Sequence, residues 1–136
     1  MSRLYRPAVL TDADRLLALW RSARFKMKAL PSLTFVAEED GTVEAALGLN
    51  FEDTTIIAGP LVVAPEAKTK RLMILRLIEA MEAWIVQAGV TAYLFSIPLA
   101  NKRWNGIIQH FGLTPYATKN GSRWYVREMT NGRRRT

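Results

Sequence analysis

The chain has 136 residues, of which 49% are hydrophobic and 23% charged, as is typical of one globular domain with a core of its own. No apolar run approaches the roughly 18 residues of a membrane-spanning helix, so we expect no membrane association and no signal peptide. The absence of cysteine excludes disulfides and thiolate metal sites, and a single histidine argues against a metal centre. These features predict a cytoplasmic protein that holds no metal.

The chain is basic, with 19 lysines and arginines against 12 acidic residues and a net charge of +7. Three positive charges come from Arg133, Arg134 and Arg135. We expect these to lie in a basic, disordered tail, 130–136, that follows a single domain of residues 1–129. The charge suits an anionic partner such as a nucleotide, a nucleic acid or an acidic protein surface. It is equally typical of a surface that charge keeps soluble, and both interpretations stay open.

The first predicted elements are a strand and a helix. Residues 4–6 form a short strand, and Pro7 places it at an edge or at a strand start. Thr11 lies three residues before Asp14, a spacing that predicts an N-cap with an acidic first turn. The helix behind it has an apolar face at helical spacing, made of Leu16, Leu17, Trp20, Ala23 and Met27.

The next segments predict an antiparallel meander of three strands. Residues 33–38 and 42–51 are joined by Asp40-Gly41, a strong signal for a two-residue hairpin turn. Residues 54–63 form the third strand, in which Gly59-Pro60 predicts a bulge or a splayed backbone.

The second half of the chain alternates helices with strands. Apolar residues at steps of three and four predict a long helix over 68–88, which Gly89 ends. The later elements are a strand at 90–97, a helix at 101–111, a strand at 113–118, an Asn120-Gly121 turn and a strand at 123–128. This order predicts an α/β (α+β) fold with a mixed, mostly antiparallel central sheet of about seven strands and helices on both faces.

Residues 101–113 read NKRWNGIIQHFGL and resemble the closing motif of the GNAT N-acetyltransferase superfamily. That motif has an asparagine, a small or apolar residue three positions later, a tyrosine seven later and Gly-Phe eleven and twelve later. The chain has Asn101, Trp104, Gly112 and Leu113 at the matching positions. Ile108 stands at the place of the tyrosine. The resemblance extends over residues 4–128, if 27–32 replace the second helix of the family, and it implies a GNAT-like fold.

The same resemblance implies an acetyl-CoA site where the strand 54–63 passes into the long helix. In the family, glycines at the helix start let backbone N–H groups approach the pyrophosphate. Val63 and Pro65 match the family pattern here, whereas Arg71 and Met73 replace the glycines. The candidate cofactor residues are Val63, Lys68, Lys70, Arg71 and Asn101.

Two interpretations of the basic residues at this helix start stay open. In the first, Lys68, Lys70 and Arg71 replace the backbone donors with side-chain cations, and acetyl-CoA still binds. In the second, they form the solvated face of a helix that has no phosphate site.

Acetyl transfer to an amine needs a base for the amine proton and a donor for the leaving thiolate. Because Ile108 cannot donate a proton, Tyr116 is the candidate donor. Tyr93 fits a core position, and His110 fits a partly exposed site near a helix end. Glu44 is the candidate base, since it occupies a polar position in a central strand, whereas the neighbouring acids Glu52 and Asp53 fit a solvated turn.

The four tryptophans divide into two pairs. Trp20 and Trp84 fit the core faces of helices. Trp104 and Trp124 have basic neighbours, which suits a nucleic-acid or protein surface.

Two functions therefore stay open. In one, the chain is a GNAT-fold protein with a degenerate acetyl-CoA site that is non-catalytic or weakly active and binds a macromolecular partner. It then loosely resembles the degenerate GNAT-like proteins of tailed bacteriophages, which implies a virion or host-takeover role. In the other, it is an active N-acetyltransferase that moves an acetyl group from acetyl-CoA to an amine. A homo-oligomer is compatible with both.

Overall fold

The computed structural model describes residues 3–22, 33–52, 55–130 and 133–134. Its strands are β1 (Arg3–Pro7), β2 (Leu33–Glu39), β3 (Thr42–Glu52), β4 (Thr55–Val63), β5 (Ala92–Pro98), β6 (Thr114–Lys119), β7 (Ser122–Thr130) and β8 (Arg133–Arg134). Its helices are the 3-10 helix η1 (Leu10–Asp12) and the α-helices α1 (Ala13–Ser22), α2 (Lys70–Gln87) and α3 (Lys102–Phe111).

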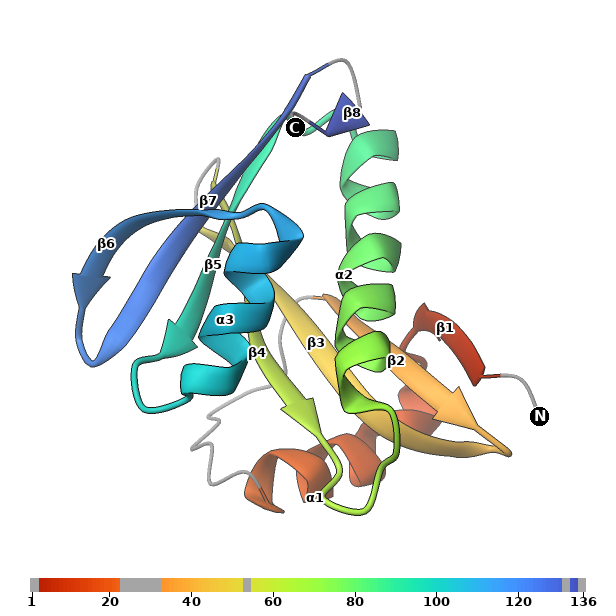
Figure 1. The fold of residues 1–136 in the computed structure, drawn as a ribbon. Helices are drawn as coiled ribbons and strands as arrows, with labels where there is room; N and C mark the ends of the chain where they lie inside the picture. The colour runs from red at the N-terminus through yellow and green to blue at the C-terminus, as the bar shows by residue number, and fades with distance from the viewer. Residues whose placement is uncertain (1–2, 23–32, 53–54, 131–132, 135–136) are drawn as a thin grey trace. The chain divides into compact units, whose positions relative to one another are not determined.

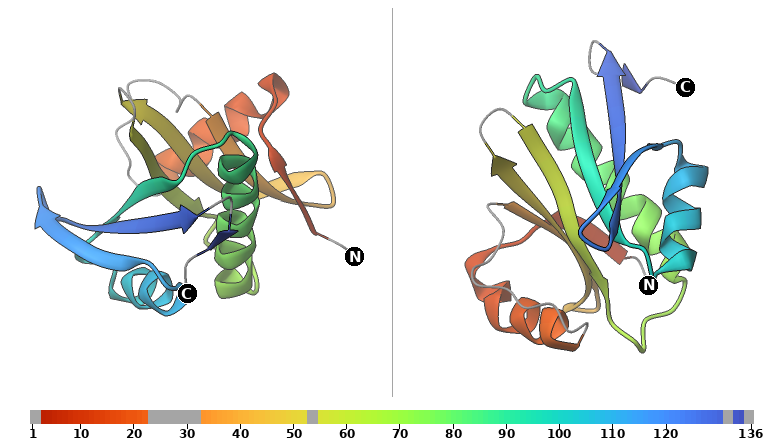
Figure 2. Two further views of the ribbon diagram at one scale, coloured as in Figure 1. Left: turned by 90° about the horizontal axis from the view of Figure 1, so that it is seen from above. Right: turned by 90° about the vertical axis from the view of Figure 1, so that its left-hand side faces the viewer.

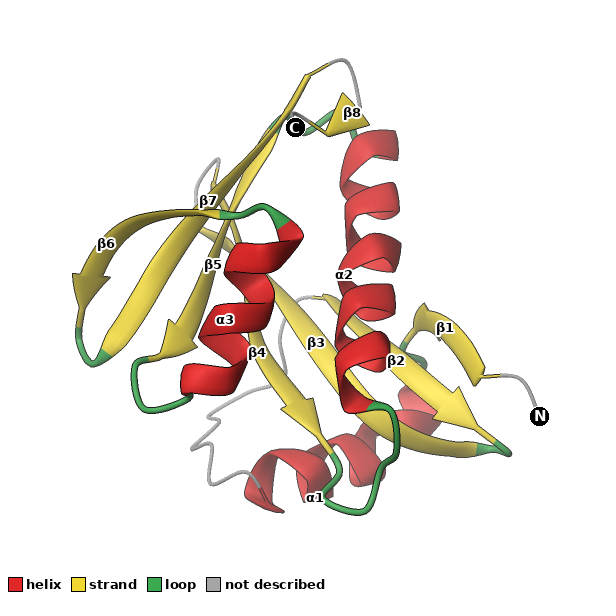
Figure 3. Cartoon of the chain, in the orientation of Figure 1, coloured by secondary structure: helices red, strands yellow, loops and turns green. Residues whose placement is uncertain are grey.

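The strands hydrogen-bond in the order β1-β2-β3-β4-β5-β7-β6, and β8 pairs with β7 (Figure 1, Figure 3). The pairing of β4 with β5 is parallel, whereas β1 with β2, β2 with β3, β5 with β7 and β6 with β7 are antiparallel. The predicted mixed, mostly antiparallel sheet with helices is therefore confirmed. No helix among the described residues is long and apolar enough to cross a membrane.

The chain divides into two compact units. The first unit comprises Met1–Leu49 and Pro60–Met81, and the second comprises Asn50–Gly59 and Glu82–Thr136. The organisation as one domain over residues 1–129 stays a prediction.

In the first unit, β1, β2 and β3 form antiparallel neighbours. The turn between β2 and β3 has positive φ at both Asp40 (54°) and Gly41 (80°), so the predicted hairpin is confirmed. Ala45, Ala46 and Leu47 follow one another in β3 and are all fully buried. Because successive strand residues point to opposite faces, this part of the sheet is covered on both. Figure 2 shows α1 and the first turns of α2 on opposite faces of β2 and β3.

The start of α1 differs from the prediction. Thr11 is exposed and lies inside η1, so it is not the N-cap of the helix. The carboxylate of Asp12 instead accepts a hydrogen bond from the backbone N–H of Val9 at 2.8 Å. Val9 is thus the N-cap of η1, and the buried Asp12, at 8% exposure, accepts the hydrogen bond from the N-cap backbone.

The second unit contains β5, β7, β6 and α3. β5 pairs with β4 at Ile57–Leu94 and Ala58–Phe95, and with β7 along its whole length. Asn120 (φ 54°) and Gly121 (φ 75°) confirm the predicted hairpin turn between β6 and β7. α3 lies against one face of β5 and β7 (Figure 1). The core here is formed by Tyr93, Phe95, Ile97, Ile107, Ile108, Tyr125 and Met129.

The long helix and the last strand of the meander follow the predicted pattern with two differences. α2 begins at Lys70, two residues later than expected, and Gly89 follows its end with a φ of 78°. Trp84 is half-buried and packs against Phe51 at a ring-centroid distance of 6.1 Å, so it is not a fully buried core residue. The predicted departure from regular strand geometry occurs at Gly59, where φ is 134°.

The C-terminal segment is described up to Thr130 and again at Arg133–Arg134. β7 continues to Thr130, and Arg133–Arg134 form β8, whose partners are Met129 and Thr130. The expectation of a disordered tail over 130–136 stays a prediction. The segment 27–32, expected to replace a second helix, lies outside the described residues.

Candidate functional site

The segment between β4 and α2 lies in the first unit, and a backbone hydrogen bond connects it to β3. The N–H of Ala64 donates to the carbonyl of Glu44 at 2.7 Å, and the N–H of Ala67 donates to the carbonyl of Ala64 at 3.0 Å. Met73 N–H donates to the carbonyl of Thr69 at 3.1 Å, so the helical hydrogen bonds begin there. The earlier first-turn N–H groups of α2 have no helical acceptor, and such groups favour anions.

The basic side chains at this helix start are directed to solvent. Lys68 and Arg71 are exposed, and Lys70 is partly exposed. Met73, by contrast, is fully buried in the core. At the two positions where the GNAT motif has glycines, one side chain therefore points outward as a cation and the other packs inward.

Thr69, the residue before α2, has an unusual backbone. Its φ is 52°, in the left-handed region that β-branched residues rarely adopt. Arg3 from β1 reaches this residue: Nη1 donates to Thr69 Oγ1 at 3.0 Å, and Nη2 donates to the carbonyl of Lys68 at 3.1 Å. The Thr69 hydroxyl also donates to the carbonyl of Lys68 at 2.6 Å.

Glu44, the candidate base, lies beside Arg3. Its Oε1 is 3.6 Å from Arg3 Nη2, and Glu39 is 3.8 Å from the same nitrogen. Within the described part of the chain, Glu44 Oε1 is buried and accepts no hydrogen bond. The structure thus places Glu44 with the residues that support the start of α2. Its role as a base stays a prediction.

The other predicted site residues lie in the second unit. Tyr116 is 55% exposed on β6, where the register with β7 shifts between Pro115 and Ala117. Asn101 is the N-cap of α3, and its Oδ1 accepts a hydrogen bond from Trp104 N–H at 3.1 Å. The proton-donor role of Tyr116 and the cofactor role of Asn101 stay predictions.

Three further residues of the second unit bear on proton donation. Ile108 is fully buried, so the position of the family's tyrosine belongs to the core here. Tyr93 is also buried, and its hydroxyl donates to Glu82 Oε2. His110 is exposed at the end of α3.

A buried ion pair in the second unit was not anticipated from the sequence. Arg127 of β7 is 5% exposed, and its Nε donates to Glu82 Oε2 of α2 at 3.1 Å. Its guanidinium also lies over the ring of Phe111, 5.2 Å from the centroid. The sequence contained a signal for this buried arginine. Tyr125, Arg127 and Met129 are two residues apart in the strand, so they point to the same face of the sheet, where the other two are apolar or aromatic.

A second network in the same unit joins α3 to β7. The hydroxyl of Tyr125 donates to Asn105 Oδ1 at 2.6 Å and accepts from Gln109 Nε2 at 3.2 Å. Asn105 Nδ2 donates to the carbonyls of Pro98 and Asn101. These bonds satisfy buried polar groups and orient α3, so the network is structural.

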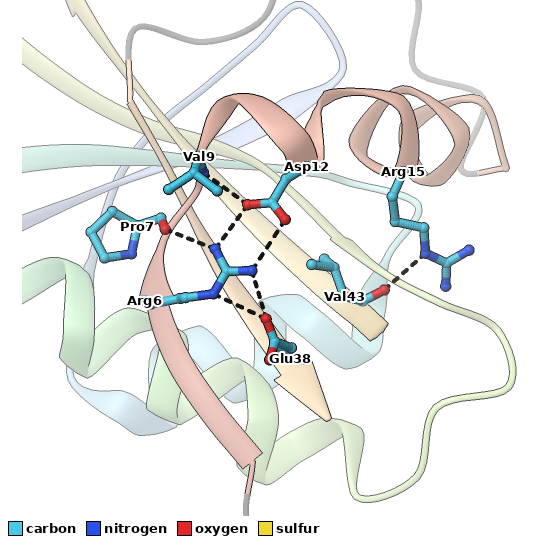
Figure 4. Close-up of polar contacts among 7 residues, drawn as sticks. All are labelled: Arg6, Pro7, Val9, Asp12, Arg15, Glu38 and Val43. Atoms are coloured by element: carbon cyan, nitrogen blue, oxygen red, sulfur yellow. Dashed lines mark hydrogen bonds and ion pairs between the residues drawn. The ribbon is translucent and has the colours of Figure 1, made fainter. Parts of the chain in front are cut away.

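In the first unit, Arg6 connects β1, β2 and η1, the element that directly precedes α1 (Figure 4). Its guanidinium donates to both oxygens of Asp12, at 2.8 and 3.1 Å, and to Glu38 Oε1 at 2.6 Å. These hydrogen bonds lower the pKa of Asp12 and raise that of Arg6. Arg15 lies nearby and donates to the carbonyl of Val43 at 2.9 Å.

The tryptophans expected at a binding surface are not freely exposed. Trp104 and Trp124 are half-buried, and the ammonium of Lys119 lies over the ring of Trp124, 5.6 Å from its centroid. A nucleic-acid base could stack on that face only by displacing the lysine. Among the described residues, no three histidine or acidic side chains gather as metal ligands would.

The sequence matches no protein-family model, and no curated protein matches it. Solved structures do match. An N-acetyltransferase from Staphylococcus aureus Mu50 superposes with a TM-score of 0.79 at 17% identity, covering 96% of this chain and 100% of that chain. A putative acetyltransferase from Salmonella typhimurium, solved with its cofactor acetyl-CoA, has a TM-score of 0.77 at 14% identity. The match covers 96% of this chain and 95% of that chain. A GNAT-family acetyltransferase from Streptococcus pneumoniae has a TM-score of 0.75 at 12% identity and covers 95% and 100%.

These comparisons concern the fold, since the identities are low. The chain has the GNAT fold and is acetyltransferase-like in its architecture, as the closing motif predicted. The matching structure from Salmonella typhimurium holds acetyl-CoA, and the start of α2 is where this chain carries exposed positive charge. Lys68 and Arg71 are exposed there, and the side chain of Met73 leaves the helix start clear because it lies in the core.

Proposed function

We propose that this chain is a GNAT-fold protein that binds the diphosphate of acyl-CoA at the start of α2 and is non-catalytic or weakly active. The observation that carries the proposal is the opposite placement of Arg71 and Met73, one exposed and the other fully buried. An exposed cation at a helix N-terminus opposes the helix dipole, and a bound anion would relieve this. Lys68 and Lys70 would add to the attraction.

Weak catalysis is proposed because a proton donor is lacking where the family has one. Bound acetyl-CoA would supply an acetyl thioester, and its leaving thiolate needs a proton. Ile108 cannot supply it and is fully buried. Tyr116 is the remaining candidate, on an exposed edge strand. One alternative is an active N-acetyltransferase that moves an acetyl group from acetyl-CoA to an amine at the same site.

Another alternative is a protein that binds a macromolecule through the same cations and has no cofactor. An acidic protein surface would be the partner that this charge favours, and a virion or host-takeover role would follow from the bacteriophage resemblance. A nucleic acid is a weaker candidate, since Lys119 lies over the ring of Trp124.

Isothermal titration with CoA and acetyl-CoA, at low and moderate salt, tests the proposal. We expect micromolar binding that weakens as salt rises, because the attraction is between charges. The Lys68→Gln/Arg71→Gln double variant should bind at least about tenfold more weakly, which corresponds to about 1.4 kcal/mol. The matched control is Lys102→Gln/Arg103→Gln, which removes two exposed cations from the first turn of α3.

Binding that both double variants weaken equally would contradict a site at α2. An undetectable interaction at millimolar CoA would exclude the cofactor and leave the macromolecular alternative. If CoA binds, a screen of amine acceptors by thiol release then separates a weak enzyme from a non-catalytic protein. The Tyr116→Phe variant shows whether that hydroxyl contributes to any turnover observed.

A further inference from the structure

The start of α2 contains a strained residue that the protein holds in place. Thr69 has a φ of 52°, and its β-branched side chain makes the left-handed region especially unfavourable. Such strain persists only where the surroundings over-determine it, and it concentrates at binding and catalytic sites. The first-turn N–H groups of α2 follow directly after Thr69 in the chain.

Arg3 donates hydrogen bonds to Thr69 and to the residue before it. Its two terminal nitrogens bind successive groups, the Lys68 carbonyl and the Thr69 hydroxyl, at 3.1 and 3.0 Å. The side chain is only 12% exposed, and its partner in the loop lies 66 residues away along the chain. The planar fork of a guanidinium can hold two acceptors in fixed positions, which an ammonium cannot.

The acids beside Arg3 explain why its side chain stays in this position. Glu39 and Glu44 lie 3.8 and 3.6 Å from Nη2. They balance the charge of the largely covered guanidinium, so that Arg3 does not need a solvent-exposed anion as its partner. The exposed cations Lys68 and Arg71 remain available to a ligand.

We propose that Arg3 is a positioning residue for the diphosphate site: it holds Thr69 in the left-handed conformation and thereby aims the first-turn N–H groups of α2 at the anion. This inference rests on the proposed function. Glu44 then belongs to the support of the site, through its ion pair with Arg3 and through its carbonyl, which accepts from Ala64.

A double-mutant cycle tests the inference, with CoA binding measured by titration and folding by urea denaturation. Arg3→Gln should weaken CoA binding at least about tenfold, because Thr69 is released from the left-handed region. Thr69→Gly should bind nearly as wild type, since glycine adopts positive φ without strain. In the double variant, Arg3→Gln should cost much less affinity than it does beside threonine. Arg3→Lys, which keeps the charge without the fork, serves if Arg3→Gln does not fold.

The control is Arg6→Gln, which removes the same charge from the same strand but from a guanidinium bound to Asp12 and Glu38. It should leave CoA binding unchanged while it lowers stability. Wild-type protein that does not bind CoA overturns the diphosphate site and this role of Arg3 together. If wild type binds and Arg3→Gln binds equally well, only the role of Arg3 is overturned. Equal losses in the single and double variants would also overturn it, because Arg3 would then act without Thr69.

Discussion

At the scale of single residues, two separate physical constraints favour glycine at position 112. It ends α3 with a φ of 112°, which glycine adopts readily. A Cβ atom there would also lie 2.7 Å from Arg127 Nη1. Arginine ends are usually able to move, but this one is buried, pairs with Glu82 and stacks on Phe111. The motif glycine therefore leaves room for the buried Arg127–Glu82 ion pair and also allows the backbone conformation that ends α3.

Gly112→Ala is expected to destabilise the protein by about 2–4 kcal/mol in urea denaturation, since strain at positive φ and displacement of a buried ion add. Gly89→Ala is the matched control. Gly89 also follows a helix with positive φ (78°), but a Cβ atom added there would meet nothing within 4 Å among the described residues. It should cost only about 1–2 kcal/mol. Equal costs for the two variants would show that Arg127 moves freely.

At the scale of elements, α3 is held by its cap and by polar groups that face β7. Asn101 caps the N-terminus through Trp104 N–H, and Asn105 connects the first turn to Tyr125. A helix of this length is marginal alone, so such contacts decide whether it forms. This explains the asparagine of the closing motif without a ligand, and the cofactor role of Asn101 needs its own test.

Asn101→Ala should lower the free energy of unfolding by about 1 kcal/mol, because the Trp104 N–H loses its acceptor. Asn101→Ser retains a capping oxygen and should lie within a few tenths of a kcal/mol of wild type. Urea denaturation measures both. If the serine variant keeps its stability but loses CoA affinity about tenfold, Asn101 contacts the ligand as the resemblance implies.

At the scale of the whole molecule, charge decides the response to pH. The chain has a net charge of +7 at neutral pH, and acidification adds positive charge as its 12 acidic residues are protonated. One of them, Asp12, has a pKa lowered by the hydrogen bonds from Arg6. Its contribution to stability is therefore present above the ordinary aspartate range and is lost as the pH falls through the lower pKa of the folded state.

Wild type should thus lose stability steeply below about pH 4, and Asp12→Asn should show a flatter dependence in the same range. At neutral pH, Asp12→Asn should cost about 1–3 kcal/mol, since charge-assisted hydrogen bonds are weakened. Urea denaturation across a pH range of about 2–7 measures both effects. The control is Asp14→Asn, which removes an exposed carboxylate two residues after Asp12. The attribution to Asp12 fails if the two variants have the same pH profile.

The turns and helix ends that could be predicted from the sequence are those that depend on the backbone preferences of neighbouring residues. Asp40-Gly41 and Asn120-Gly121 determine their hairpins because few residues accept positive φ, and Gly112 marks a helix end for the same reason. Together with the order of apolar periods, these signals determine the GNAT fold. Thr11 misled the prediction, because a spacing rule cannot show that Asp12 is oriented by Arg6.

What only the tertiary structure decided are contacts between residues far apart along the chain. Arg3 meets Thr69 across 66 positions, and Arg127 meets Glu82 across 45. No local pattern encodes such pairs, since each depends on which strands and helices pack together. The sequence determined that a basic helix start exists at Lys68–Arg71. The tertiary structure decided that Met73 packs inward, that Arg71 stays in solvent and that a distant arginine hydrogen-bonds to Thr69, between the strand and the helix.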